Sequence, residues 1–246
     1  MNPIPLPAHS ITLTGIDDST ELSMLERIAM RYPSVMIEWA VLHNPRHAGT
    51  GRFASAGRIE ELFDRLWGHL NIRLAVHLCG EGVSDFLRGQ NRVVHWAKVF
   101  DRVQLNLVAQ HETGLLLARA ITQHNTPRIV LQHNTRNTEL VARLDEYGVP
   151  SDRCDVLFDA SGGRGKLPVH WPDAVVTDRR VGFAGGLGPK NLAKQLPLIA
   201  KAASKQGATG FWVAMESSLR DVDDRFSVDH AEECVKLFSN WQAEQS

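Results

Sequence analysis

The sequence predicts an α/β fold, a single-domain (β/α)8 TIM barrel over residues 1–246. Eight apolar runs of about 5 to 8 residues, rich in β-branched side chains, recur along the chain. Turn-forming residues and a longer stretch with helical spacing follow almost every run. Dividing the 246 residues by eight gives about 31 per unit, close to what a minimal barrel uses. No linker, low-complexity tract or block of like charge divides the chain, which favours one domain.

The expected strands share an apolar core and are bounded by turn-forming residues. They cover residues 11–15, 35–42, 72–79, 102–108, 128–133, 155–159, 181–184 and 210–215. A doubly wound open sheet is the alternative fold for alternating strands and helices. It usually has five or six strands and needs a reversal of strand order, so a count of eight favours the barrel.

The expected helices lie between these strands and show apolar residues at helical spacing. They cover residues 21–31, 56–70, 83–100, 114–124, 138–147, 191–206 and 230–241, with an interruption of the third near Gly89. The sixth connection, residues 166–179, contains two prolines and little periodicity. We therefore expect only a short or distorted helix there, because proline removes a helical hydrogen bond.

Composition excludes several classes of protein. The chain has 27 Lys and Arg against 28 Asp and Glu, a net charge of −1, whereas general nucleic-acid binders concentrate positive charge. The three cysteines are odd in number and form no C-x-x-C pair, which argues against a disulfide framework or a thiolate metal site. No segment has the roughly 18 uninterrupted apolar residues of a membrane helix, and the amino terminus lacks a basic leader. We expect a cytoplasmic protein that contacts neither nucleic acid nor membrane.

Two glycine clusters follow the sixth and seventh expected strands. The first contains Gly162, Gly163 and Gly165, and the second contains Gly185 and Gly186. Glycine permits positive φ and lets successive backbone N–H groups approach an anion. In a barrel the carboxyl ends of the strands form the active face, and phosphate sites often lie at this position. The pair of clusters therefore predicts a phosphate-binding site and a small phosphorylated substrate.

These motifs resemble those of the phosphoribosylanthranilate isomerases of tryptophan biosynthesis. The matching segments are V-L-F-D at 156–159, G-G-R-G at 162–165 and A-G-G-L at 184–187. Weaker matches are T-L-T-G at 12–15, N-P-R at 44–46, Q-L-N at 104–106 and E-S-S at 216–218. The resemblance spans the whole chain and is specific between residues 155 and 191. It implies the barrel fold and an Amadori rearrangement, which converts an aldose-type ribosylamine into a ketose.

The resemblance also implies roles for individual residues. Asp159 stands where the family has its general acid, and Arg46 where an arginine would pair with the anthranilate carboxylate. The glycines of both clusters would hold the phosphate, and Asn106 and Glu216 stand at further substrate-binding positions. The resemblance implies no cofactor and no metal.

One departure from the family concerns the base. Thr14 stands where the family has its cysteine, and a neutral hydroxyl without a partner is a poor base. We therefore expect a diverged isomerase or lyase rather than the tryptophan-pathway enzyme of aromatic amino-acid biosynthesis. Three histidines near strand ends, His43, His77 and His133, are candidates for a replacement base. Glu38 interrupts the second strand and should face a partner, a ligand or solvent, because a buried lone carboxylate is costly.

Two other classes of function fit the sequence. A barrel with an anion pocket could bind a sugar phosphate without catalysis. Alternatively, the three histidines could bind a divalent metal together with Asp159 or Glu216, as in a metal-dependent aldolase or epimerase. The sequence contains no H-x-H or H-E-x-x-H spacing that would support this metal-dependent hypothesis. The sequence leaves the exact substrate and the oligomeric state open.

Overall fold

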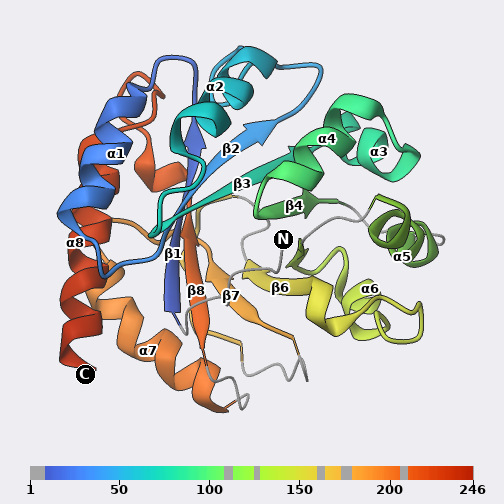
Figure 1. Ribbon diagram of the computed structural model, residues 1–246. Coiled ribbons are helices and arrows are strands. Elements are labelled where there is room, and N and C mark those ends of the chain that lie inside the picture. The colour runs from blue at the N-terminus through green and yellow to red at the C-terminus, as the bar shows by residue number, and fades with distance from the viewer. Residues whose placement is uncertain are drawn as a thin grey trace.

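The computed structural model describes residues 9–107, 113–124, 128–159, 164–172, 179–205 and 210–245. Its strands form a closed barrel in which each strand pairs in parallel with its neighbours in chain order, and β8 closes on β1. This confirms the (β/α)8 prediction (Figure 1). The strands are β1 His9–Ile16, β2 Ile37–His43, β3 Ile72–Cys79, β4 Arg102–Asn106, β5 Ile129–His133, β6 Cys154–Asp159, β7 Val181–Ala184 and β8 Phe211–Met215.

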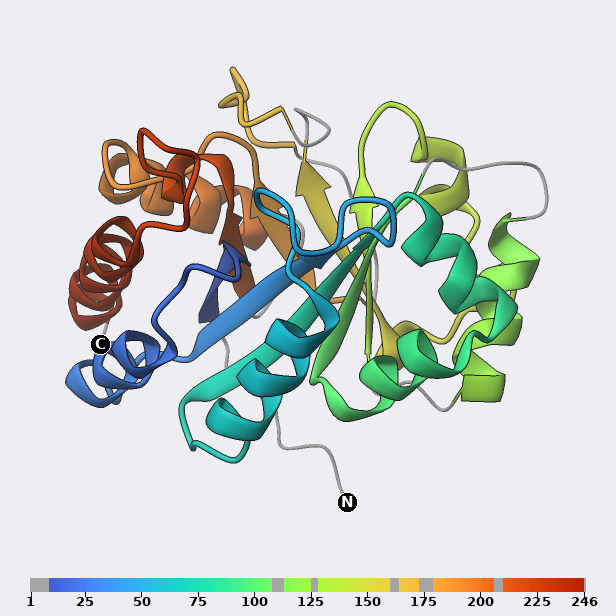
Figure 2. The same ribbon diagram turned by 90° about the horizontal axis from the view of Figure 1, so that it is seen from above.

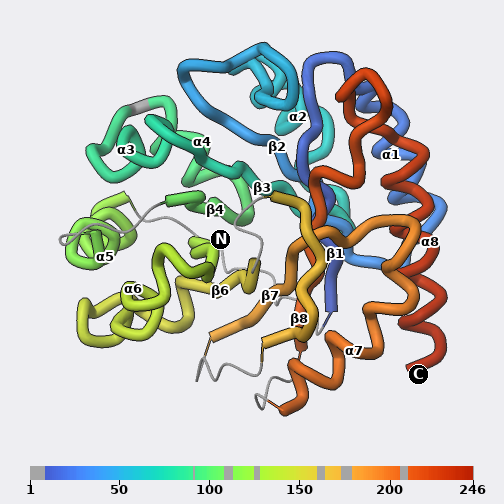
Figure 3. Tube along the Cα trace, turned by 180° about the vertical axis from the view of Figure 1, so that it is seen from behind, coloured from blue at the N-terminus to red at the C-terminus, as the bar shows by residue number. Residues whose placement is uncertain are grey.

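Helices surround the outside of the strands (Figure 2). Because α8 lies beside α1, the first and last helices close the outer ring (Figures 1 and 3). The helices are α1 Leu22–Arg31, α2 Ala56–Leu66, α3 Glu81–Arg88, α4 Asn91–Val99, α5 Thr113–His124, α6 Thr138–Ala142, α7 Leu192–Lys205 and α8 Val228–Glu244, with short 3-10 turns η1 Ser151–Arg153 and η2 Ser217–Leu219. Among the described residues, no helix has both the length and the apolar character needed to cross a membrane.

Most element boundaries fall close to the predicted ones. The expected interruption occurs at Gly89, whose φ of 80° ends α3 before α4 begins. The fifth expected helix is shorter than predicted, since α6 ends at Ala142 and turns follow it. In the sixth connection residues 164–172 form neither helix nor strand, and residues 173–178 lie outside the described part.

The apolar core lies between the strands and the helices. Outward-facing strand residues such as Leu13, Trp39 and Val103 are fully buried there. The helices supply the other half of this core, as α2 does with Ile59 and Leu62, three residues apart. Burying one such side chain stabilises the fold by about 1.5–3 kcal/mol, so this layer is the main source of stability.

Inward-facing residues form stacked layers of four, because alternate strands contribute side chains at the same height of a barrel. Following the strand register gives five layers from the base toward the carboxyl ends of the strands. They are Glu38, Arg102, Asp155 and Trp212; Thr12, Ala75, Val130 and Gly182; Ala40, Gln104, Leu157 and Ala214; Thr14, His77, Gln132 and Ala184; and Leu42, Asn106, Asp159 and Glu216.

The lowest of these layers is ionic. Arg102, 3% exposed, donates from Nε to Glu38 Oε2 and from Nη2 to Glu38 Oε1, both at 2.6 Å. Its guanidinium also lies 4.4 Å from the ring centre of Trp212. The Trp212 ring fits because Gly182 faces it, since a Cβ there would lie 2.1 Å from the ring. The layer confirms that Glu38 faces a partner and gives the bore a closed floor.

Candidate active site

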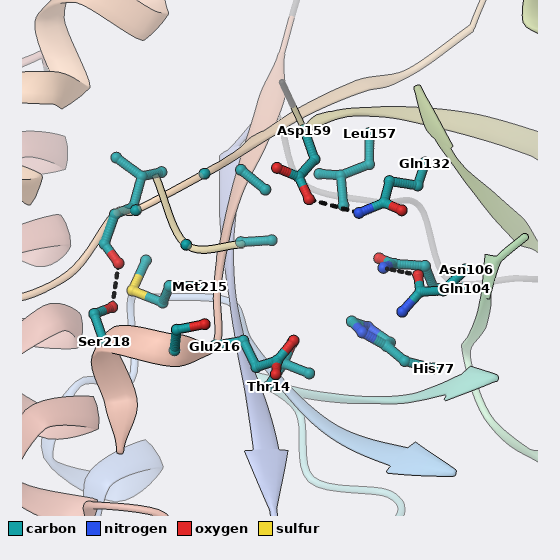
Figure 4. A pocket seen from close by; sticks show the side chains of 17 residues that line it. Thr14, His77, Gln104, Asn106, Gln132, Leu157, Asp159, Met215, Glu216 and Ser218 are labelled. Carbon is teal, nitrogen blue, oxygen red and sulfur yellow. Dashed lines mark hydrogen bonds between the residues drawn. The ribbon is translucent and has the colours of Figure 1, made fainter. Parts of the chain in front are cut away.

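A pocket opens at the carboxyl ends of the barrel strands, where barrel active sites lie. It encloses about 540 Å³ of space, which includes open solvent at its mouth. Figure 4 shows the 17 residues that line it. One layer contributes all four of its side chains to the lining: Thr14, His77, Gln132 and Ala184. Most side chains of the layers directly above and below it also line the pocket. The pocket is therefore the unfilled upper part of the barrel bore.

The pocket has one open wall and one polar wall. Ala184 and Ala214 are the inward residues of β7 and β8, and their small side chains leave space. On the opposite side β4 and β5 contribute the amides of Gln104, Asn106 and Gln132. Figure 4 shows these amides facing an empty centre. A substrate with several hydroxyl groups suits such a wall, because each amide has both a donor and an acceptor.

The glycine clusters line the open wall. Gly165, Gly185 and Gly186 have φ of 62°, 119° and 64°, the left-handed region that favours glycine. A Cβ on Gly186 would lie 2.5 Å from the backbone nitrogen of Leu167, so the two glycine turns pack directly on each other. Gly162 and Gly163 lie outside the described residues.

The second glycine turn is held in place by Asn191. Its Oδ1 accepts from the N–H of Gly188 at 3.0 Å, and its Nδ2 donates to the carbonyl of Gly186 at 2.8 Å. Two serines from η2, Ser217 and Ser218, complete this end of the pocket. The Ser218 hydroxyl donates its proton to the Leu187 carbonyl. The backbone turn and the Ser217 hydroxyl supply donors suited to a phosphate.

Asp159, the predicted acid, is at the end of β6 and lines the pocket while only 4% exposed. Its Oδ2 accepts a hydrogen bond from Gln132 Nε2 at 2.5 Å. Gln132 Oε1 in turn accepts from Asn134 Nδ2 at 3.2 Å, which fixes the direction of the Gln132 amide. These contacts hold the Asp159 carboxyl in one orientation toward the pocket (Figure 4).

Thr14 and His77 share one layer on the side of the pocket opposite Asp159 (Figure 4). Burial lowers the pKa of His77 to about 4, and the positive charge of Arg102 in the ionic layer also lowers it, against the opposing effect of Glu38. The imidazole is therefore neutral near pH 7. In the described part of the chain no residue forms a hydrogen bond with either of its ring nitrogens.

Asn106 lines the pocket as predicted and is held by two neighbours. Its Oδ1 accepts from Gln104 Nε2 at 2.7 Å, and its Nδ2 lies 3.3 Å from the Cys79 sulfur. Burial raises the pKa of Cys79 to about 11, so the thiol is protonated near pH 7. Cys79 therefore provides no thiolate in place of the one missing at Thr14.

Glu216, the other predicted binding residue, reaches the pocket from the end of β8. Its Oε1 accepts from Arg52 Nη1 at 2.7 Å, and Arg52 Nη2 also contacts Asp224 Oδ1 at 3.1 Å. Burial raises the pKa of Glu216 despite the charge of Arg52. Arg52 lies in the exposed loop after β2 and was not among the predicted site residues.

Arg46 does not lie where the resemblance placed it. Its side chain is 71% exposed and donates from Nε to Glu81 Oε1 at 2.8 Å, and it is not among the pocket-lining residues. Glu81, in the first turn of α3, holds the guanidinium at the surface of the barrel. The structure thus brings Asp159, Thr14, Asn106 and Glu216 together but leaves Arg46 outside.

The three candidate histidines have different surroundings. His43 packs edge-on against Trp96 with ring centres 4.8 Å apart, and His133 against Phe158 at 5.2 Å. Of the three, His77 alone lines the pocket. Within the described ranges no three His, Cys, Asp or Glu side chains come together as a metal site. The geometry of these residues therefore gives the metal-dependent reading no support.

Two lining residues, Gln104 and Gln132, were not predicted as site residues. The available signal was their alternation in the strands, because residues two apart on a barrel strand face the same side. Gln104 precedes Asn106 by two positions, and both face inward. The sequence alone does not fix the height of each residue in the bore, which depends on the register of all eight strands.

Comparisons with known proteins agree with this architecture. The phosphoribosyl anthranilate isomerase of Thermus thermophilus is 16% identical, with a TM-score of 0.61 and coverage of 94% of this chain and 99% of that one. A phosphoribosyl anthranilate isomerase solved with reduced 1-(o-carboxyphenylamino)-1-deoxyribulose 5-phosphate is 14% identical, with a TM-score of 0.58 and coverage of 94% and 98%. The chain has the fold of these isomerases.

The same fold also occurs with other chemistry. The phospho-2-dehydro-3-deoxyheptonate aldolase of Thermotoga maritima is 12% identical, with a TM-score of 0.56 and coverage of 97% of this chain and 71% of that one. No protein-family model and no curated protein sequence matches the chain. These comparisons confirm the fold that the motifs predicted, and function has to be argued from the site.

Proposed function

We propose that this protein is a diverged isomerase of the phosphoribosylanthranilate isomerase type, acting on a small phosphorylated, sugar-like substrate. The observation that carries the proposal is the placement of a buried carboxyl, Asp159, and two packed glycine turns on one pocket at the carboxyl ends of the strands. The reaction proposed is an Amadori-type conversion of an aldose to a ketose. A solved neighbour of the same fold holds a deoxyribulose 5-phosphate derivative, which is the type of ligand proposed here.

The substrate would lie along the pocket with its phosphate at the open wall. The turn at Gly185 and Gly186, with Ser217, offers hydrogen-bond donors there. The sugar hydroxyls would face the amides of Gln104 and Gln132 on the opposite wall. This orientation places the ring between Asp159 and His77.

Asp159 would act as the general acid. It would donate its proton to the ring oxygen while the bond between that oxygen and C1 breaks, so the ring opens and an iminium ion forms at C1. The hydrogen bond from Gln132 keeps the carboxyl directed at one point in the pocket. Arg46 has no part in this proposal, because Glu81 holds it at the surface.

The ligand test compares thermal stabilisation by ribose 5-phosphate, inorganic phosphate, unphosphorylated ribose and divalent cations, since a ligand raises stability by mass action. We expect ribose 5-phosphate to raise the melting temperature and ribose to do so much less. Stabilisation by cations alone would support the metal-dependent alternative instead. The absence of any effect from phosphorylated compounds would contradict the phosphate site.

The activity test follows conversion of phosphoribosylanthranilate by liquid chromatography. We expect Asp159→Asn to lower kcat at least about 100-fold, the lower end of a general acid's contribution. Asp64→Asn, an exposed change on α2, serves as the matched control and should leave kcat unchanged. A wild type that ribose 5-phosphate stabilises but that does not convert phosphoribosylanthranilate would exclude this substrate and favour either a diverged isomerase of another sugar phosphate or a binding barrel.

A further inference from the structure

An Amadori isomerisation needs a proton acceptor as well as an acid, because C2 loses its proton after the ring opens. Thr14, at the position of the family's base, has an alcohol hydroxyl that is a poor base near pH 7. Cys79 is protonated, since burial raises the pKa of its thiol. The acceptor must therefore be another group that faces the pocket.

His77 is such a group. It extends from β3 into the same layer as Thr14, is 4% exposed, and lines the pocket. The strand register puts Ala184 of β7 across the bore from it, so the space in front of the imidazole is open. Figure 4 shows His77 and Asp159 on opposite sides of this space.

The imidazole has no other evident task in the described part of the chain. No described residue forms a hydrogen bond with its ring nitrogens, and neither nitrogen is among the fully enclosed polar atoms without a partner, so they are accessible from the pocket. A buried imidazole that faces a pocket without a protein partner points to a ligand as the partner. The charged groups beneath it, Glu38 and Arg102, are paired with each other and belong to the floor of the bore.

We infer that His77 is the base that takes the C2 proton in this protein, replacing the function of the cysteine that is absent at Thr14. The inference rests on the proposed isomerase function. A ring nitrogen of neutral His77 binds the proton, the C2–H bond breaks, and its electron pair forms the C1–C2 double bond and neutralises the iminium nitrogen. The imidazolium then returns a proton to C1 while the 2-hydroxyl proton restores the Asp159 carboxyl. The product is thus an isomer of the substrate, and both residues recover their starting forms.

The test compares His77→Gln and His77→Ala with the wild type on phosphoribosylanthranilate and on the same compound deuterated at C2. We expect kcat to fall by about 100-fold to 10,000-fold in both variants, the range for loss of a general base. The melting-temperature shift caused by ribose 5-phosphate should persist. Added imidazole should restore part of the activity of His77→Ala, because it fits the space that the side chain leaves.

The isotope effect separates proton abstraction from a structural role. Deuterium at C2 should lower kcat more in His77→Gln than in Asp159→Asn, since only the former slows the step that breaks the C2–H bond. His133→Gln, at the end of β5 and outside the pocket, is the matched control and should keep its activity.

The possible outcomes distinguish the two proposals. An active wild type whose His77→Gln variant keeps its kcat, or shows no larger isotope effect, would overturn the role of His77 alone. A wild type that is inactive on phosphoribosylanthranilate and is not stabilised by ribose 5-phosphate would overturn the proposed function and this inference with it. If His77→Ala does not fold, His77→Gln still decides the question, because its side chain retains polar atoms and a similar volume.

Discussion

Replacing Arg102 with methionine tests the ionic layer that closes the bore beneath the pocket. Arg102 forms a two-pronged ion pair with Glu38 and a further hydrogen bond from Nη2 to Thr12 Oγ1 at 3.2 Å. Both members of the pair are at least 95% buried by side-chain area, with 3% and 5% exposed. Methionine keeps the length and apolar packing of the side chain but leaves Glu38 with one neutral partner, the Thr12 hydroxyl.

The loss of unfolding free energy in Arg102→Met follows from the ion partner that Glu38 loses. Removing one partner of a buried ion pair costs about 3–5 kcal/mol, because the other charge remains buried without compensation. At roughly 2–4 °C per kcal/mol for a chain of this size, a loss near 4 kcal/mol lowers the melting temperature by roughly 8–16 °C. The double variant Glu38→Leu with Arg102→Met should recover most of this loss, since it removes the Glu38 charge and Asp155, which also lies 3.6 Å from Arg102, keeps Arg128 at 2.8 Å.

The pH dependence provides a second measurement. Burial by itself raises the pKa of Glu38, but Arg102 and Thr12 reverse this effect and lower it in the wild type. The stability that Glu38 contributes is therefore present near pH 7 and is lost as the pH falls through that lowered pKa. Without Arg102, burial raises the pKa of Glu38, and the folded variant gains protons as the pH falls. The gap in unfolding free energy between variant and wild type should narrow between about pH 7 and about pH 5.

Urea unfolding followed by circular dichroism at both pH values measures these free energies. Two results would refute the reasoning. The first is a decrease in unfolding free energy below about 1 kcal/mol for Arg102→Met, which is the size expected of an exposed ion pair. The second is a double variant no more stable than the single one, because the cost would then come from altered packing rather than from a stranded charge.

Two further substitutions test the shape of the bore. Ala184→Leu should fill the space opposite His77 and abolish thermal stabilisation by ribose 5-phosphate, while the unfolding free energy changes little. If ribose 5-phosphate still stabilises this variant, the ligand lies elsewhere. Gly182→Ala should destabilise by about 1–3 kcal/mol or more, because its Cβ would meet the Trp212 ring at 2.1 Å. Gly57→Ala, in α2 with open space around it, is the control and should stabilise by about 0.4–1 kcal/mol in urea unfolding.

The repeat of strands and helices could be predicted because each unit has its own local signals. Apolar runs mark the strands, and Gly89 breaks one expected helix into α3 and α4 as the sequence indicates. The end of α6 could not be predicted in the same way. The residues after Ala142 keep some helical spacing, yet they form turns that carry Leu144 and Tyr147 into the core.

The site could be predicted only where its residues belong to the backbone pattern of the fold. Asp159 and the glycine turns are at strand ends, so their place in the sequence fixes their place on the active face. Arg46 and Arg52 lie on the same loop, and either could face the pocket. Neither lines the pocket, because Glu81 holds Arg46 at the surface and Glu216, which does line the pocket, holds Arg52.

The register of the barrel explains why the pocket begins where it does. In the ionic layer Trp212 crosses the bore beside Gly182, and the side chains there leave no room for a ligand. Two layers higher, β8 contributes Ala214, and one layer above that β7 contributes Ala184. The bore is consequently filled below and empty above on the side of β7 and β8. His77 faces that empty side from β3, so the small residues that create the pocket also expose its imidazole to a ligand.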